Sequence, residues 1–154
     1  MKKKTYPKPT PFWRFLFVVY CALLLWLLFD RTPGWGNADT YAEVLRGNMN
    51  LTPFRTIDHY WSVVKKMEFT PLFYHCVINL GGNIFLFIPI GYFLPRLWLS
   101  LRNFLFFLLT CTLAIVLVEL LQLVTLLGSL DIDDLILNLF GMLLGYLFFI
   151  IFKK

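Results

Sequence analysis

The chain has 154 residues, of which 59% are hydrophobic, 19% aromatic and only 15% charged, and its mean hydropathy is +0.72. A soluble domain of this size exposes too much surface to hide so many apolar side chains, and a disordered chain contains far fewer of them. The composition therefore excludes both classes and predicts a single membrane domain over residues 1–154 that crosses the bilayer several times.

The net charge of +5 is distributed unlike that of a nucleic-acid-binding protein. Nine basic residues sit beside apolar runs: Lys2, Lys3, Lys4, Lys8, Arg14, Arg96, Arg102, Lys153 and Lys154. Basic residues in such places are typical of the cytoplasmic flanks of membrane spans, whereas a nucleic-acid-binding surface needs a basic patch on a folded domain. We therefore expect the lipid bilayer as a partner and no nucleic acid.

Four apolar runs have the length of about 17–25 residues that a helix needs to cross the hydrocarbon. They cover about residues 12–29, 74–94, 104–127 and 135–152. An Asp-Arg-Thr-Pro stretch follows the first run in place of a small-residue cleavage site, so we expect an uncleaved helix there. Four crossings put both termini on one side, and the basic ends predict that this side is cytoplasmic. The predicted fold is an all-α membrane protein with four transmembrane helices.

A long segment, residues 30–73, joins the first two spans and is extracytoplasmic in this topology. It carries five basic and five acidic residues, so its charge balances to zero, as an outer loop permits. Within residues 54–69, apolar side chains recur at helical spacing opposite Asp58, Lys65 and Lys66. That pattern predicts a short amphipathic helix, which either lies on the outer membrane face or packs on the bundle as a lid.

Polar side chains inside the spans are informative because a charge near the bilayer centre costs about 2.5–3.5 kcal/mol on insertion scales. Glu119 is the one carboxylate well inside a span, roughly 12 Å below its outer end at about 1.5 Å of rise per residue. In the fourth span, Asp133 points away from the stripe formed by Asp131, Asp134 and Asn138. Since the polar groups of three spans fall at a similar depth, we predict that they line an outward-open polar pocket. Its residues are Asn79, Asn83, Glu119, Gln122, Asp134 and Asn138.

Structural roles compete with this pocket. The amide side chains equally suit hydrogen bonds between helices. Asp131 is expected to be the N-cap of the fourth helix, and Asp134 lies in a favourable position near the positive end of the helix dipole. Gly141 and Gly145 form a G-x-x-x-G pair that indicates close helix packing. Pro89 is expected to kink the second span.

The sequence offers few motifs for catalysis or cofactor binding. His59 and His75 lack a paired cysteine or carboxylate at ligand spacing, so no metal and no cofactor are expected. The three cysteines lie in apolar runs and are interpreted as small hydrophobic residues. An intramembrane enzyme is one alternative, with Glu119 as general base and Asp134 as an orienting group acting on a lipid-linked substrate. A small transporter or partner subunit is another.

Four stretches, in the same order, resemble motifs of VanZ-like membrane proteins. Residues 50–57 are similar to N-L-x-P-F-x-T-I, and residues 79–95 contain N-x-x-G-N-x-x-x-F-x-P-x-G. Residues 119–122 are similar to E-x-x-Q, and residues 131–141 to D-x-x-D-x-x-x-N-x-x-G. The resemblance extends from about residue 50 to the end of the chain, and the four motifs together make it specific.

This resemblance implies a small multi-pass protein of the bacterial cytoplasmic membrane, some of whose relatives lower susceptibility to teicoplanin and other lipoglycopeptides. Relatives often carry an arginine just before the D-x-x-D run, and this chain has none at residues 127–130. Arg55 or Arg31 of the outer loop is expected to serve as the charge partner or lid instead. We expect the outward-facing pocket to bind an amphiphile: a lipid-linked envelope precursor, a lipid head group or a lipoglycopeptide.

Overall fold

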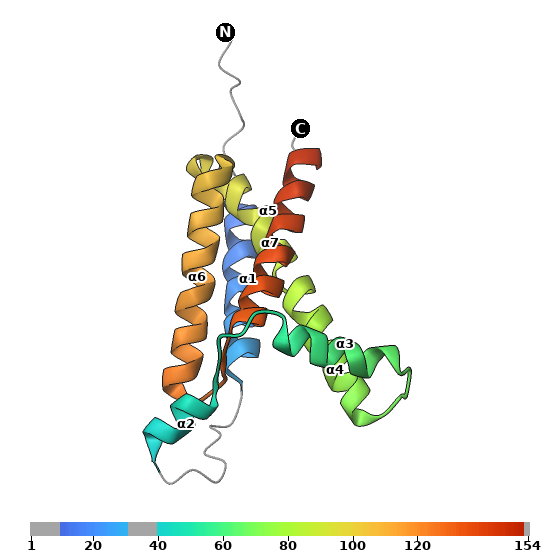
Figure 1. Ribbon diagram of the computed structural model, residues 1–154. Coiled ribbons are helices and arrows are strands. Elements are labelled where there is room, and N and C mark those ends of the chain that lie inside the picture. Colours follow the sequence, from blue (N-terminus) through green and yellow to red (C-terminus); the bar gives the residue numbers. More distant parts are fainter. Residues whose placement is uncertain (1–9, 31–39, 153–154) are drawn as a thin grey trace.

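The computed structural model describes residues 10–30 and 40–152 of the chain (Figure 1). Four helical segments in this part are long and apolar enough to cross a membrane, which confirms the predicted all-α membrane fold. They are α1 (Pro11–Phe29), the pair α4 (Pro71–Phe85) and α5 (Ile88–Leu97), α6 (Phe104–Thr125) and α7 (Ile132–Phe152). Arg31 and the basic residues at 2–8 and 153–154 lie outside the described residues.

The spans form a bundle whose two ends carry different elements (Figure 1). The first residues of α1, the last residues of α7 and the short 3-10 helix η1 (Leu99–Arg102) lie at one end, here called the η1 end. The small elements that follow α1, and the connection from α6 to α7, lie at the other end, here called the loop end. Four crossings return the chain to its starting side, so this arrangement is the one that four spans require.

The second span, Pro71–Leu97, consists of two helices that meet just before Pro89, the residue at which the sequence predicted a kink. α4 ends at Phe85, and α5 begins after Leu86 and Phe87. Pro89 gives the physical reason, because it has no N–H to donate to the carbonyl of Phe85 and its ring clashes with that carbonyl. The Tyr20 hydroxyl of α1 donates a hydrogen bond to the carbonyl of Leu86, which ties the first span to the break.

Glycines let α7 approach α4 and α5 at backbone distance. A Cβ added to Gly145 would lie 1.9 Å from the carbonyl oxygen of Ile88, and one added to Gly141 would lie 2.2 Å from that of Ile84. Gly91 of α5 approaches the backbone of α7 in the same way. The G-x-x-x-G pair therefore serves close helix packing, as its spacing predicts.

The core of the bundle is built from aromatic and aliphatic side chains. Phe107, Cys111 and Ile115 follow one face of α6 at helical spacing and are at most 1% exposed. The ring of Tyr146 from α7 packs on Phe107, with the two centroids 4.4 Å apart. Most large apolar side chains on the outer faces of the spans are exposed, as expected for helices that contact lipid.

The loop end contains three short elements from the first connection and one from the last. They are α2 (Tyr41–Gly47), β1 (Met49–Asn50), α3 (Arg55–Lys65) and β2 (Leu130–Asp131). β1 and β2 pair in parallel, with Met49 opposite Leu130 and Asn50 opposite Asp131. This pairing attaches the connection between the first two spans to the start of α7.

α3 is the amphipathic segment, and it is shorter than the predicted 54–69. The helix ends at Lys65, and Met67 has a positive φ of 54°, a conformation that cannot continue a right-handed helix. α3 packs against α4, where the ring centroids of Tyr60 and His75 are 5.8 Å apart. α3 therefore contacts the outer part of the second span, and whether it also lies on the membrane face stays open between the two expected alternatives.

Candidate functional site

The N-terminus of α3 is capped by a carboxylate from α7. Phe54, at the N-cap position, has a φ of 66° and makes no side-chain cap hydrogen bond. Instead, Oδ1 of Asp133 accepts a hydrogen bond from the backbone N–H of Phe54 at 2.5 Å. Oδ2 accepts from the N–H of Thr56 at 2.7 Å and from that of Ile57 at 3.1 Å. Asp133 is 0% exposed, so these donors stand in for water, and its charge lies at the positive end of the α3 dipole.

Asp131 forms the second part of this network. Its Oδ1 accepts from the side-chain amide of Asn50 at 3.1 Å and from the backbone N–H of Asp133 at 2.9 Å. The second of these bonds joins the residue before α7 to the second residue of the helix, which is N-cap geometry. Its Oδ2 accepts from the Thr56 hydroxyl at 2.6 Å, and the Asn50 amide also donates to that hydroxyl at 2.9 Å. Asn50, Thr56 and Asp131 therefore close a triangle of hydrogen bonds.

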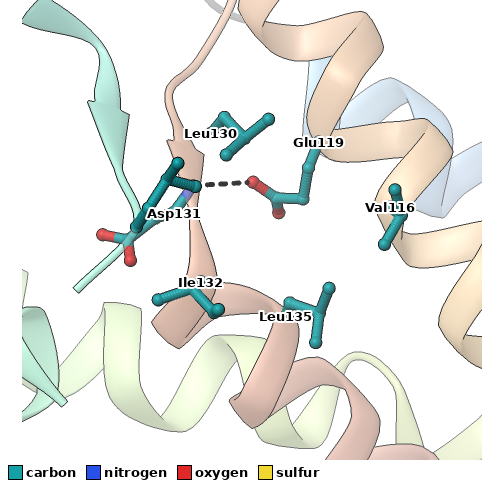
Figure 2. Close-up of a pocket in the computed structure, with 7 residues that line it drawn as sticks. Val116, Glu119, Leu130, Asp131, Ile132 and Leu135 are labelled. Atoms are coloured by element: carbon teal, nitrogen blue, oxygen red, sulfur yellow. Dashed lines mark hydrogen bonds between the residues drawn. The ribbon is translucent and has the colours of Figure 1, made fainter. Parts of the chain in front are cut away.

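Glu119 of α6 approaches β2 from the side opposite to β1 (Figure 2). Its Oε2 accepts from the backbone N–H of Asp131 at 3.2 Å, and the side chain is 4% exposed. A cavity of about 210 Å³ lies beside this bond. It is lined by Leu51, Val116, Glu119, Leu130, Asp131, Ile132 and Leu135. Figure 2 shows the Asp131 carboxylate pointing away from Glu119, so aliphatic side chains make up most of the wall of this apolar cavity.

The network brings three buried carboxylates to the loop end: Asp131, Asp133 and Glu119. The described residues contain no group of three or more His, Cys, Asp or Glu side chains that is arranged to hold a metal ion. The donors to the two aspartates are backbone N–H groups, an amide and a hydroxyl, so each carboxylate fixes a piece of main chain. The result is a wall formed by β1 and the first turn of α3, held against the start of α7 and next to the apolar cavity.

Three other predicted pocket residues, Asn83, Asp134 and Gln122, take part in hydrogen bonds that join pairs of helices. Asn83 of α4 donates to Oδ1 of Asp134 in α7 at 2.5 Å. Gln122 of α6 donates to the carbonyl of Leu28 in α1 at 2.9 Å. Both contacts are hydrogen bonds between spans, which is the structural role that competes with a pocket for these amides.

Among the described residues, Asn79 and Asn138 form no hydrogen bond to another span. Asn79 donates to the carbonyl of His75 in its own helix at 3.0 Å. Asn138 is 3% exposed, and its Oδ1 has no hydrogen-bond partner among the residues that the structure describes. Of the six residues predicted to share a pocket, Glu119 alone lines the apolar cavity. Helical rise fixes the depth of a side chain but not the neighbour that it faces, and the shared polar pocket of these six residues stays a prediction.

Arg55, one of the two predicted charge partners, lies at the start of α3. It is the first residue of α3, is exposed, and forms no ion pair with any residue that the structure describes. It lines a second pocket with Thr56, His59 and Tyr60. Because neutral donors bond to Asp131 and Asp133, the missing arginine before β2 is not needed to satisfy these two carboxylates.

Sequence reasoning missed the central place of Asp133. Helical periodicity correctly separates it from the stripe of Asp131 and Asp134, but the side that it faces is where residues 50–57 lie. The available signal was the joint presence of two motifs, one at residues 50–57 and one at residues 131–141, since polar groups of the first donate to carboxylates of the second. No local spacing predicts contact between stretches so far apart in the chain.

The fold and this site define a multi-pass membrane protein in which the connection after the first span is bonded to the start of the last span. The family model VanZ/LLP1 matches residues 17–153, and the chain belongs to that family. The matched range includes all four motifs on which the resemblance was based. No curated protein and no solved structure matches the chain.

Proposed function

We propose that the protein binds an amphiphile from the outer leaflet of the bacterial cytoplasmic membrane, with the apolar part of the ligand in the apolar cavity. The observation that carries this proposal is the place of the cavity, whose aliphatic walls adjoin the buried Glu119–Asp131 bond at the loop end of the bundle. An amphiphile is the class of molecule that presents apolar and polar groups side by side at such a boundary.

The residues of the η1 end support an orientation with both termini in the cytoplasm. The guanidinium of Arg96 lies over the ring of Trp13, 4.1 Å from its centroid. Nε of Arg102 donates to the carbonyl of Pro95 at 3.0 Å. Arginine at the cytoplasmic flanks, together with aromatic side chains at the interface, is the pattern of the positive-inside rule and the aromatic belt. In this orientation the loop end and its cavity face the outer leaflet.

The size of the apolar cavity limits what it holds. At about 210 Å³ it is smaller than the roughly 300–1,000 Å³ of sites that enclose a drug-sized ligand, so it takes a segment of one chain. A lipid tail in a bilayer has already left water, so the cavity contributes packing contacts and little hydrophobic transfer free energy. Polar groups near the cavity therefore determine which ligand binds.

A cavity-filling variant tests the proposal. Val116 lines the apolar cavity, whereas Leu117, the next residue of α6, is 58% exposed on the lipid-facing side. We expect Val116→Phe to weaken binding of dioleoylglycerol by about tenfold, because forcing a chain into an overpacked site costs about 1–3 kcal/mol. Leu117→Phe adds an aromatic ring on the same helix and is expected to leave binding unchanged. Native mass spectrometry of the detergent-solubilised full chain measures the bound fraction, and equal binding by the two variants would contradict the proposal.

We propose a link between this site and drug susceptibility, which the resemblance to VanZ-like proteins implies. Teicoplanin is an acyl-bearing lipoglycopeptide, and a lipid-linked envelope precursor also presents an apolar chain with a polar head. We propose that the chain lowers teicoplanin susceptibility, and that it does so through occupancy of the apolar cavity by one of these ligands.

A further inference from the structure

A second pocket, polar in character, lies on α3. Its volume is about 580 Å³, and its lining residues are Arg55, Thr56, His59 and Tyr60; we call it the Arg55 pocket. Arg55 and His59 are four residues apart, so their side chains lie on the same face of the helix. The lining set contains no acidic residue, although Asp58 belongs to the same helix.

Arg55 has donors to offer to a ligand. Its guanidinium carries five N–H donors in a fixed planar arrangement that matches the oxygens of a phosphate or carboxylate group. The side chain is exposed and has no ion pair within the described part of the chain. The buried Asp133 bonds to the backbone N–H groups of Thr56 and Ile57 and is not among the residues that line the pocket.

One hydrogen bond links a residue that lines the Arg55 pocket to a residue that lines the apolar cavity. Thr56 lines the pocket, and its hydroxyl donates at 2.6 Å to Asp131, which lines the cavity. Figure 1 shows α3 at the level of the first turn of α7, close to the loop end of the bundle, where the head groups of the outer leaflet are placed in the proposed orientation.

We propose that the Arg55 pocket binds the phosphate of a lipid whose acyl chain enters the apolar cavity. This inference rests on the proposed function and names the ligand class of the same site. Charge decides between lipid classes, since the Arg55 guanidinium, which forms no ion pair with the described residues, favours an anionic head, and phosphate is the anion that membrane lipids carry. Bidentate pairing of guanidinium with phosphate makes arginine specific for such a head.

Comparison of two lipids with the same tails tests this inference. The full chain in neutral detergent is titrated with dioleoyl phosphatidic acid, with dioleoylglycerol and with inorganic phosphate, and native mass spectrometry gives the bound fraction. The native chain is expected to bind the phosphate lipid about tenfold more tightly than dioleoylglycerol, and Arg55→Gln is expected to remove this preference. Lys65→Gln makes the same charge change on α3 outside the pocket and is expected to keep the preference.

The outcomes separate this inference from the proposed function. If the native chain binds both lipids equally, phosphate recognition is overturned while binding of an amphiphile stands. If Arg55→Gln keeps the preference, or Lys65→Gln loses it, the assignment to the Arg55 pocket is overturned. If inorganic phosphate binds as tightly as the lipid and depends on Arg55, the pocket takes the free anion and the lipid assignment is overturned. If neither lipid binds the native chain, the proposed function itself fails.

Discussion

Replacing Asp133 by asparagine tests whether this carboxylate fixes the loop segment to the last span. Asp133 is 0% exposed and accepts backbone hydrogen bonds from Phe54, Thr56 and Ile57. Asparagine keeps one acceptor oxygen, loses the charge and turns an NH₂ group toward backbone donors. Hydrogen bonds to a charged group contribute about 1.5–3 kcal/mol each, and a helix cap about 0.5–2 kcal/mol. Because the three bonds share one carboxylate and are not additive, we expect the local opening free energy to fall by about 3 kcal/mol.

Hydrogen–deuterium exchange measures this loss directly. A fall of about 3 kcal/mol corresponds to roughly a hundredfold faster exchange in peptides that cover Thr56 and Ile57. Asp58→Asn removes a charge from the first turn of the same helix at an exposed position, and it is expected to leave exchange at these amides unchanged. The capping role would be refuted if Asp133→Asn folds and the exchange rates of Thr56 and Ile57 match those of the native chain.

Three further predictions concern packing, a buried amide and the cell. Gly91→Ala is expected to lower the free energy of unfolding in detergent by more than about 3 kcal/mol, because its Cβ would lie 1.9 Å from a backbone oxygen of α7. Gly82→Ala is the control: its Cβ would have no atom within 4 Å, so we expect no change or a stabilisation of up to about 1 kcal/mol. Asn138→Leu removes a buried oxygen that lacks a partner among the described residues, so unfolding stability is expected to be unchanged or higher, and a clear loss would show that the amide makes a needed contact. In a sensitive Gram-positive host, the native chain and Leu117→Phe are expected to raise teicoplanin tolerance, whereas Val116→Phe at the same membrane level is expected not to raise it. Vancomycin serves as the control drug. Equal teicoplanin tolerance from both variants would show that the phenotype does not depend on the cavity.

The spans are predictable from the sequence because membrane crossing is decided by length and apolarity, which are local properties. The close approach at Gly141 and Gly145 follows from their spacing, and the disruption at Pro89 follows from a missing N–H. The depth of Glu119 is also a local quantity, since helical rise determines it.

The partners of the polar residues are not predictable in this way. Asn83 bonds to Asp134, whereas Gln122 bonds to a carbonyl of α1. The rotation of each helix about its own axis determines which partner such a side chain faces. The place of Asp133 depends on a segment that is distant in the chain and lies across the start of α7. Its recognition needs tertiary structure, because no periodic pattern in residues 50–57 points to a carboxylate in the last span.

Photo-crosslinking of a lipid in the membrane tests most directly whether the apolar cavity holds an amphiphile. The full chain is reconstituted with phosphatidic acid whose acyl chain carries a diazirine, and the labelled residues are mapped by peptide sequencing in the mass spectrometer. We predict adducts on cavity residues such as Val116, Leu130 and Leu135, lost in Val116→Phe and kept in Leu117→Phe. Labelling spread over the lipid-facing sides of α1 and α6, with no change in Val116→Phe, would contradict binding in the cavity.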